Sequence, residues 1–100
     1  MGRNRAKGSG ADDSEQRVSK EAVAGISLVL ETIVNGMVDK PLETHFSYSV
    51  GNKTVVCSIS TGEGDAGHLI GRQGRNADSI RQVMRCVAKK YGTDCVIEID

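Results

Sequence analysis

The chain has 100 residues, with 13 basic and 13 acidic side chains that leave no formal net charge when both histidines are neutral. This length accommodates one small domain with a modest hydrophobic core. The sequence contains no apolar run of about 18 residues, so it predicts no membrane-spanning helix.

The start of the chain and the cysteines indicate a cytoplasmic protein. No apolar signal-peptide core follows Met1. Cys57, Cys86 and Cys95 lack the paired spacing that holds a metal, and an odd count fits a reducing compartment in which thiols fill apolar space. A disulfide between Cys57 and Cys95, on neighbouring strands, is the less favoured alternative.

Residues 1–17 differ in composition from the rest of the chain. Basic and small residues up to Gly10 precede an acidic stretch from Ala11 to Gln16, and neither part has apolar periodicity. We therefore expect a disordered tail over residues 1–17 and a folded domain over 18–100. The tail either adds nonspecific affinity for phosphate or only improves solubility.

A first helix is expected to begin after Ser19, which suits an N-cap, and to end at Asp39-Lys40, ahead of Pro41. Apolar residues at spacings of three and four predict its buried stripe: Val23, Ile26, Leu30, Ile33 and Met37. Additional apolar side chains widen this stripe, namely Ala22, Val29 and Val34. Burial against a second long helix explains the excess, and contact between two copies of the chain is the alternative.

Three segments alternate between apolar and polar residues, as expected of strands with one buried face. Their apolar positions are Phe46, Tyr48 and Val50 in the first, Val55, Cys57 and Ile59 in the second, and Cys95, Ile97 and Ile99 in the last. Gly51-Asn52 predicts a two-residue turn that joins the first two segments as a hairpin.

Two helices are predicted between the second and the last strand. Asp65 suits the N-cap of a short helix that ends at Ile70, and a longer helix runs from about Arg75 to Lys90. The core positions of the longer helix are Ala77, Ile80, Met84, Val87 and Tyr91.

The tetrapeptide Gly71-Arg72-Gln73-Gly74 separates these two helices. We expect Gly71 to end the short helix in a left-handed conformation, and Gly74 to let the chain enter the next helix with its amides facing outward. Amides at a helix start bind anions such as phosphate. Arg72 adds charge and Gln73 a neutral donor, while the charge of Arg75 opposes the helix dipole until a phosphate binds.

Basic residues concentrate around this tetrapeptide. Between His68 and Tyr91, six basic residues accompany one acidic residue, Asp78, a balance of six minus one, or +5, so the rest of the chain carries −5. One basic region on a neutral chain indicates a nucleic-acid-binding surface, whereas the alternative is a merely solvated helix face.

The stretch Ile70-Gly71-Arg72-Gln73-Gly74-Arg75, followed by Ala77 and Ile80, resembles the KH domain, and more narrowly the small bacterial KH proteins of the KhpA type. The resemblance covers roughly residues 20–100. It implies an α+β fold of the type II KH order, α-β-β-α-α-β, with a three-stranded mixed sheet covered by helices on one face and the GxxG loop between the two core helices.

The resemblance also implies a groove for single-stranded RNA beside the loop. The residues implied are Ile70, Gly71, Arg72, Gln73, Gly74, Arg75, Ala77 and Ile80, with Leu69 on the apolar floor. For Ile70 and Ile80, simple core packing is the alternative role.

Three residues depart from the family pattern at the edge of this groove. Asn76 replaces a usually apolar residue, Asp78 stands where relatives tend to be basic, and His68 replaces a more usual lysine. Asn76 is interpreted as a neutral surface substitution, with a hydrogen bond to a base as the less favoured alternative.

The predicted function is therefore that of a non-catalytic RNA-binding protein, a post-transcriptional regulator or RNA chaperone, with no cofactor and no metal. The sequence lacks a nucleophile beside a base, a Walker loop and metal-ligand spacing. The alternative implied by the resemblance is a dimerising adaptor in cell elongation and division. It would form a homodimer or pair with a larger Jag-type (KhpB) KH protein, and its RNA binding would be weak or lost.

Overall fold

The structure is a computed structural model that describes residues 18–100. The predicted tail over residues 1–17 lies outside the described residues. In chain order the elements are α2 (Lys20–Asn35), the 3-10 turn η1 (Pro41–Glu43), β1 (His45–Gly51), β2 (Thr54–Ser60), α3 (Ala66–Ile70), the 3-10 turn η2 (Arg72–Gly74), α4 (Arg75–Lys90) and β3 (Asp94–Ile99). This order confirms the α-β-β-α-α-β arrangement predicted from the sequence.

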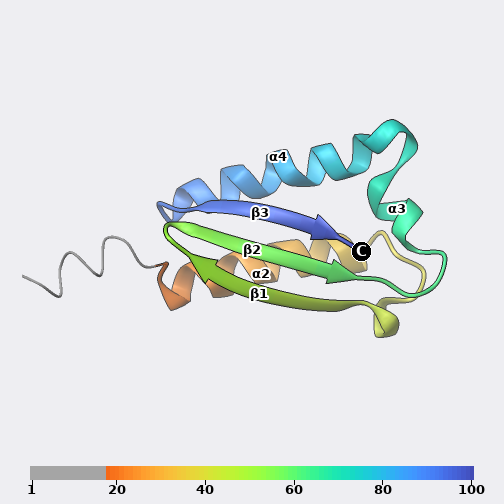
Figure 1. Cartoon of the computed structure of the whole chain (residues 1–100), viewed down its shortest axis with the longest axis horizontal. Coiled ribbons are helices and arrows are strands. Elements are labelled where there is room, and N and C mark those ends of the chain that lie inside the picture. Colours follow the sequence, from red (N-terminus) through yellow and green to blue (C-terminus); the bar gives the residue numbers. More distant parts are fainter. Residues whose placement is uncertain (1–17) are drawn as a thin grey trace, which may run out of the picture.

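The three strands form one mixed sheet in the order β1-β2-β3. β1 pairs with β2 antiparallel, and β2 pairs with β3 parallel. Parallel strands need a long crossover connection, and α3, η2 and α4 provide it. Figure 1 shows α2 and α4 on the same face of the sheet, with α3 at one end.

The core lies between this face of the sheet and the helices, and the strand alternation that predicted it is confirmed. Val55, Cys57 and Ile59 of β2 are fully buried, since β2 is the central strand. β3 adds Cys95 and Ile97. On the edge strand β1 the predicted apolar face is less covered: Phe46 and Tyr48 are half-buried, and Val50 is exposed.

The predicted buried stripe of α2 is wrong in part. Ile26 and Leu30 are fully buried as expected, but the stripe continues through Ala22 and Val34, at a constant spacing of four. The predicted positions Val23, Ile33 and Met37 are half-buried at its margin. The sheet covers one flank of α2 while α4 covers the other, so the most buried line runs between these two contacts.

The predicted core of α4 needs one similar correction. Ala77, Ile80 and Met84 are buried as expected, but Ala88 completes the stripe. Val87 and Tyr91 are only half-buried.

The N-terminus of α2 is confirmed, because the amide of Ala22 donates to Ser19 Oγ at 3.0 Å. Its predicted C-terminus is wrong. The helix ends at Asn35, where the amide of Gly36 donates to the carbonyls of Thr32 and Ile33, and Pro41 starts η1 instead.

The predicted hairpin turn is displaced by one residue. Gly51 pairs with Thr54 in the sheet, so the two loop residues are Asn52 and Lys53. Lys53 has φ +57°, a left-handed conformation more usual for glycine or asparagine.

All three cysteines are free. Cys57 and Cys95 do lie on neighbouring strands, with their sulfur atoms 3.6 Å apart in the core. The expectation that the thiols fill apolar space holds for this pair, whereas Cys86 is exposed on α4. Among the described residues, no helix has both the length and the apolar character needed to cross a bilayer.

Candidate nucleic-acid interface

The GxxG loop forms a corner between α3 and α4 (Figure 1). The amide of Gly71 ends α3 by donating to the carbonyl of Gly67 at 2.8 Å. Gly71 has the positive φ that was predicted, +75°, but its ψ of 175° lies outside the left-handed helical region. Gln73 and Gly74 then take left-handed helical conformations. Three of the four loop residues therefore have positive φ, an angle that residues other than glycine rarely adopt.

The outer side of the loop is open to a ligand. A Cβ atom added at Gly74 would meet no atom within 4 Å. Gly74 also occupies the N-cap position of α4 and has no side chain to cap that helix. The amide of Arg75, the first residue of α4, donates to the carbonyl of Arg72, whereas the amides that follow it in the first turn have no partner within the helix and remain for an anion. That these amides face outward remains a prediction.

The charged side chains around the loop are exposed. Arg72, Gln73 and Arg75 are all solvent-accessible, and the guanidinium of Arg75 lies 3.4 Å from Gln73 Oε1. Among the described residues, the one arginine of α4 in an ion pair is Arg81, 3.8 Å from Asp78.

The predicted apolar floor is mostly internal. Leu69 is fully buried, and Ala77 and Ile80 are each 4% exposed, so these three side chains pack the core. Ile70 is 41% exposed and is the apolar side chain beside the loop that a base can reach without rearrangement. The alternative role of core packing thus describes Ile80 better than Ile70.

A separate apolar groove lies between α2 and α4. Its volume is about 200 Å³, and it is lined by Ile33, Met37, Asn76, Ser79, Ile80 and Val83. Val83 is 47% exposed there. Sequence reasoning recognised surplus apolar residues on the first helix, but their periodicity did not reveal that some of them line a groove with α4.

Sequence reasoning also missed the role of Asn76. Its side-chain nitrogen donates to the carbonyl oxygen of His68 at 2.9 Å, across the GxxG loop. Asn76 is therefore more than a neutral surface substitution. An asparagine in the first turn of a helix carries no sequence signal for a bond to a residue eight positions earlier.

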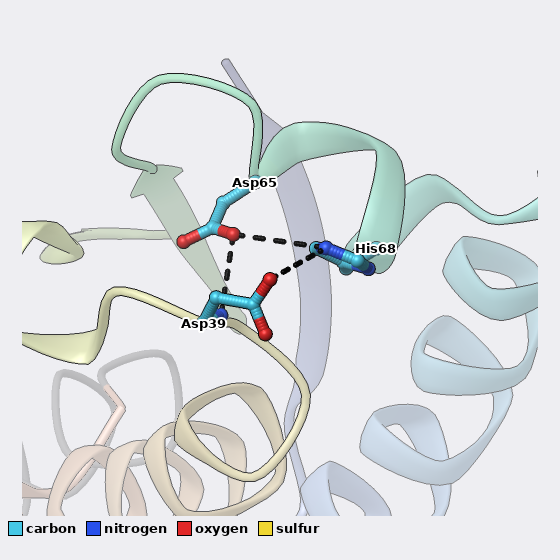
Figure 2. A group of neighbouring side chains, drawn as sticks. All are labelled: Asp39, Asp65 and His68. Carbon is cyan, nitrogen blue, oxygen red and sulfur yellow. Dashed lines mark hydrogen bonds and ion pairs between the residues drawn. The ribbon is translucent and has the colours of Figure 1, made fainter.

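Three neighbouring side chains, those of Asp39, Asp65 and His68, join α3 to the connection between α2 and η1 (Figure 2). The carboxylate of Asp65 is 2% exposed and accepts the amides of Asp39 and Lys40, at 3.2 and 2.9 Å. His68 Nε2 lies 3.2 Å from a carboxylate oxygen of Asp39 and 3.9 Å from Asp65. Asp65 holds the N-cap position of α3 as predicted, but its side chain binds the α2–η1 connection and does not cap the helix.

Within residues 18–100, these three residues are the group whose imidazole and carboxylate atoms could coordinate a metal ion, because those atoms lie within 4.8 Å of one another. Their hydrogen bonds and ion pairs to one another and to the backbone already explain this proximity. The group is therefore understood as a structural support of α3.

Comparisons with known proteins agree with the fold and with the geometry of the loop. The family model described as "KhpA/KhpB, KH domain" matches residues 27–99. The chain is 37% identical over 71 residues to the RNA-binding protein KhpA of Clostridium acetobutylicum, covering 71% of this chain and 95% of that protein. The KhpA protein of Clostridium perfringens is 34% identical over the same shares.

The RNA-binding protein KhpA of Chlamydia trachomatis is 34% identical over 70 residues, which cover 70% of this chain and 90% of that protein. No solved structure gives a significant match. The relatives are named as RNA-binding proteins, and the prediction of a non-catalytic protein agrees with these names. The family model spans more than half of the chain, and the mixed sheet, the GxxG corner and the order of elements agree with it. The chain belongs to the KhpA/KhpB family of KH-domain proteins.

Proposed function

We propose that this protein binds single-stranded RNA through the GxxG corner, as a post-transcriptional regulator or RNA chaperone in the cytoplasm. The observation that supports this most is the open, uncapped start of α4 behind two glycines of positive φ. Main-chain donors at such a position can approach a phosphate closely, because no Cβ atom stands between them and the ligand.

Each loop residue contributes a different interaction in this proposal. A phosphate accepts hydrogen bonds from the amides that follow Arg75 in the first turn of α4, where the helix dipole favours negative charge. Arg72 and Arg75 add charge-assisted contacts, and Gln73 offers a neutral donor. Ile70 provides apolar contact for a base, while Ala77 and Ile80 support the groove from the core.

The electrostatic part of this binding has a measurable signature. If about three cationic groups contact phosphates, the logarithm of affinity falls with the logarithm of salt concentration with a slope of roughly −2 for a single strand. Scarce aromatic side chains exclude strong base stacking, so affinity is expected to be modest.

The test is RNA binding by the double variant Arg72→Asp/Gln73→Asp, measured by fluorescence anisotropy with a single-stranded RNA of mixed sequence. Affinity should fall at least about tenfold, or ~1.4 kcal/mol, with an unchanged circular dichroism spectrum. The matched control is Arg85→Asp/Gln82→Asp, which makes the same two changes on the exposed face of α4 and should lose much less. Equal affinity in the loop variant and the wild type would reject the loop as the RNA-binding element.

The groove between α2 and α4 supports a second candidate function, self-association into an adaptor. Its six lining residues carry no charge, so the groove has no charge pattern that would favour a different protein over a second copy of this chain. In a two-fold contact the same apolar surface comes from both copies, and the exposed Val83 of each would cover the groove of the other. We propose this homodimer as the alternative. Pairing with a Jag-type (KhpB) protein in cell elongation and division would use the same helices.

A further inference from the structure

Asn76 closes the GxxG loop from within α4. Its Nδ2 atom donates to the carbonyl of His68, 2.9 Å away, and the whole loop lies between these two residues. The His68 carbonyl belongs to the last turn of α3, where carbonyl groups lack partners within the helix. One hydrogen bond therefore caps the short helix and joins it to the start of the next.

The same side chain lies directly against the first glycine of the loop. A Cβ atom added at Gly71 would come within 2.6 Å of Asn76 Cγ and 2.8 Å of its Nδ2. Gly71 is thus required both for its positive φ and for the space that the amide of Asn76 occupies.

The acceptor of this bond is itself held in place. The imidazole of His68 lies 3.2 Å from Asp39, and the buried Asp65 nearby accepts two amides of the α2–η1 connection (Figure 2). The loop is consequently fixed on one side by α4 through Asn76. On the other side it is fixed through His68, by a part of the chain about 30 residues earlier.

We propose that Asn76 is a positioning residue that holds the GxxG loop in its RNA-binding conformation before RNA arrives. This inference rests on the proposed function of the loop. Gly71, Gln73 and Gly74 all have positive φ, so an unrestrained loop would sample many other conformations. Holding one of them in advance lowers the entropy lost on binding. In this scheme one N–H of Asn76 is held by the His68 carbonyl, and the residue acts through the loop without contacting the RNA.

The test replaces Asn76 by leucine in the full chain, which keeps the size of the side chain and removes its donor. Gln82→Leu is the control, the same chemical change at an exposed position on the same helix. The first readout is amide hydrogen exchange by NMR without RNA. The amide of Gly71 donates to Gly67 in α3, and those of Gly74 and Arg75 donate to Gly71 and Arg72, so their exchange reports the conformation of the loop directly.

We expect these three amides to exchange at least about fivefold faster in Asn76→Leu, as in Asn76→Asp, which also lacks the donor. Amides of β2 should be unchanged, and Gln82→Leu should resemble the wild type. Unchanged exchange of the loop amides in both Asn76 variants would overturn the proposal, whatever the RNA affinity.

The second readout is RNA affinity as a function of salt. Asn76→Leu should bind single-stranded RNA about three- to tenfold more weakly than wild type and Gln82→Leu, with the same log–log salt slope, because the number of phosphate contacts is unchanged. A reduced slope would show that the variant loses contacts between cationic side chains and phosphates, which contradicts the proposal that only the order of the free loop changes, as would unchanged affinity. If the wild type itself binds no RNA, the proposed function fails, and the exchange measurement still decides whether Asn76 orders the loop.

Discussion

Tyr91, at the end of α4, packs directly onto the backbone of Gly25 in α2. A Cβ atom at Gly25 would overlap the hydroxyl group and the ring of this tyrosine. The close contact between the two helices therefore depends on a glycine in the interior of a helix, where that residue is otherwise unfavourable.

Gly25→Ala should destabilise the protein by about 1 kcal/mol, because the ring must leave its position over α2. The measurement is urea unfolding in a double-mutant cycle with Tyr91→Ala. In the Tyr91→Ala background the same Gly→Ala change should instead stabilise by about 0.5–1 kcal/mol, since only the helix preference remains. The same sign in both backgrounds would contradict the packing described.

Asp65→Asn should cost about 2 kcal/mol of unfolding free energy. The amides of Asp39 and Lys40 donate to different oxygens of the buried carboxylate, so in the asparagine variant one of them faces an NH2 group in place of an acceptor and loses its partner. Chemical denaturation provides the measurement. The control Glu63→Gln makes the equivalent change at an exposed site in the same loop and should be nearly neutral.

Tyr48 should make the protein less stable at alkaline pH. Burial, together with the 2.6 Å hydrogen bond that its hydroxyl donates to Glu31, raises the pKa of Tyr48 well above its ordinary value near 10. Above about pH 10 the unfolded state releases this proton while the folded state keeps it, so stability falls as pH rises; below that pH the contribution is fully present.

Unfolding free energies at several pH values between about 9 and 11 check this expectation. Tyr48→Phe should show a shallower loss than wild type. Parallel curves for wild type and Tyr48→Phe would disprove the assignment.

The self-association alternative makes a prediction about Val83. If two copies meet through the groove, Val83→Arg places a charge in the contact and should shift light scattering from dimer to monomer at a concentration where wild type is dimeric. Val96→Arg is the control, because Val96 is 43% exposed on β3, close to the 47% of Val83. A monomeric wild type would remove this candidate function.

The sequence was sufficient to predict the order of the elements, the buried residues of β2, Cys95 and Ile97 of β3, and the glycine corner, whereas Ile99 is only half-buried. These follow from alternation, from helical spacing and from the conformational freedom of glycine, all of which are local. The buried stripe of α2 was partly wrong because Val34 and Ile33 are equally apolar, and only the position of α4 decides which of them is covered.

The hydrogen bonds that support the loop could not be predicted from local sequence patterns, for a related physical reason. The partners of Asp65 are backbone amides of Asp39 and Lys40, and the partner of Asn76 is a backbone carbonyl. Every residue has such groups, so no residue type marks where they will be. The predicted membership of Ala77 and Ile80 in the RNA site remains a prediction, since both are core residues whose effect on a ligand would be indirect.

The placement of β3 also matters for anyone who labels this protein. Its last residues lie beside α3, whereas α2 begins at the other end of the sheet (Figure 1). A bulky fluorescent fusion or surface attachment at Asp100 would therefore emerge beside α3, the helix that leads into the glycine corner. Attachment ahead of α2 would leave that corner accessible.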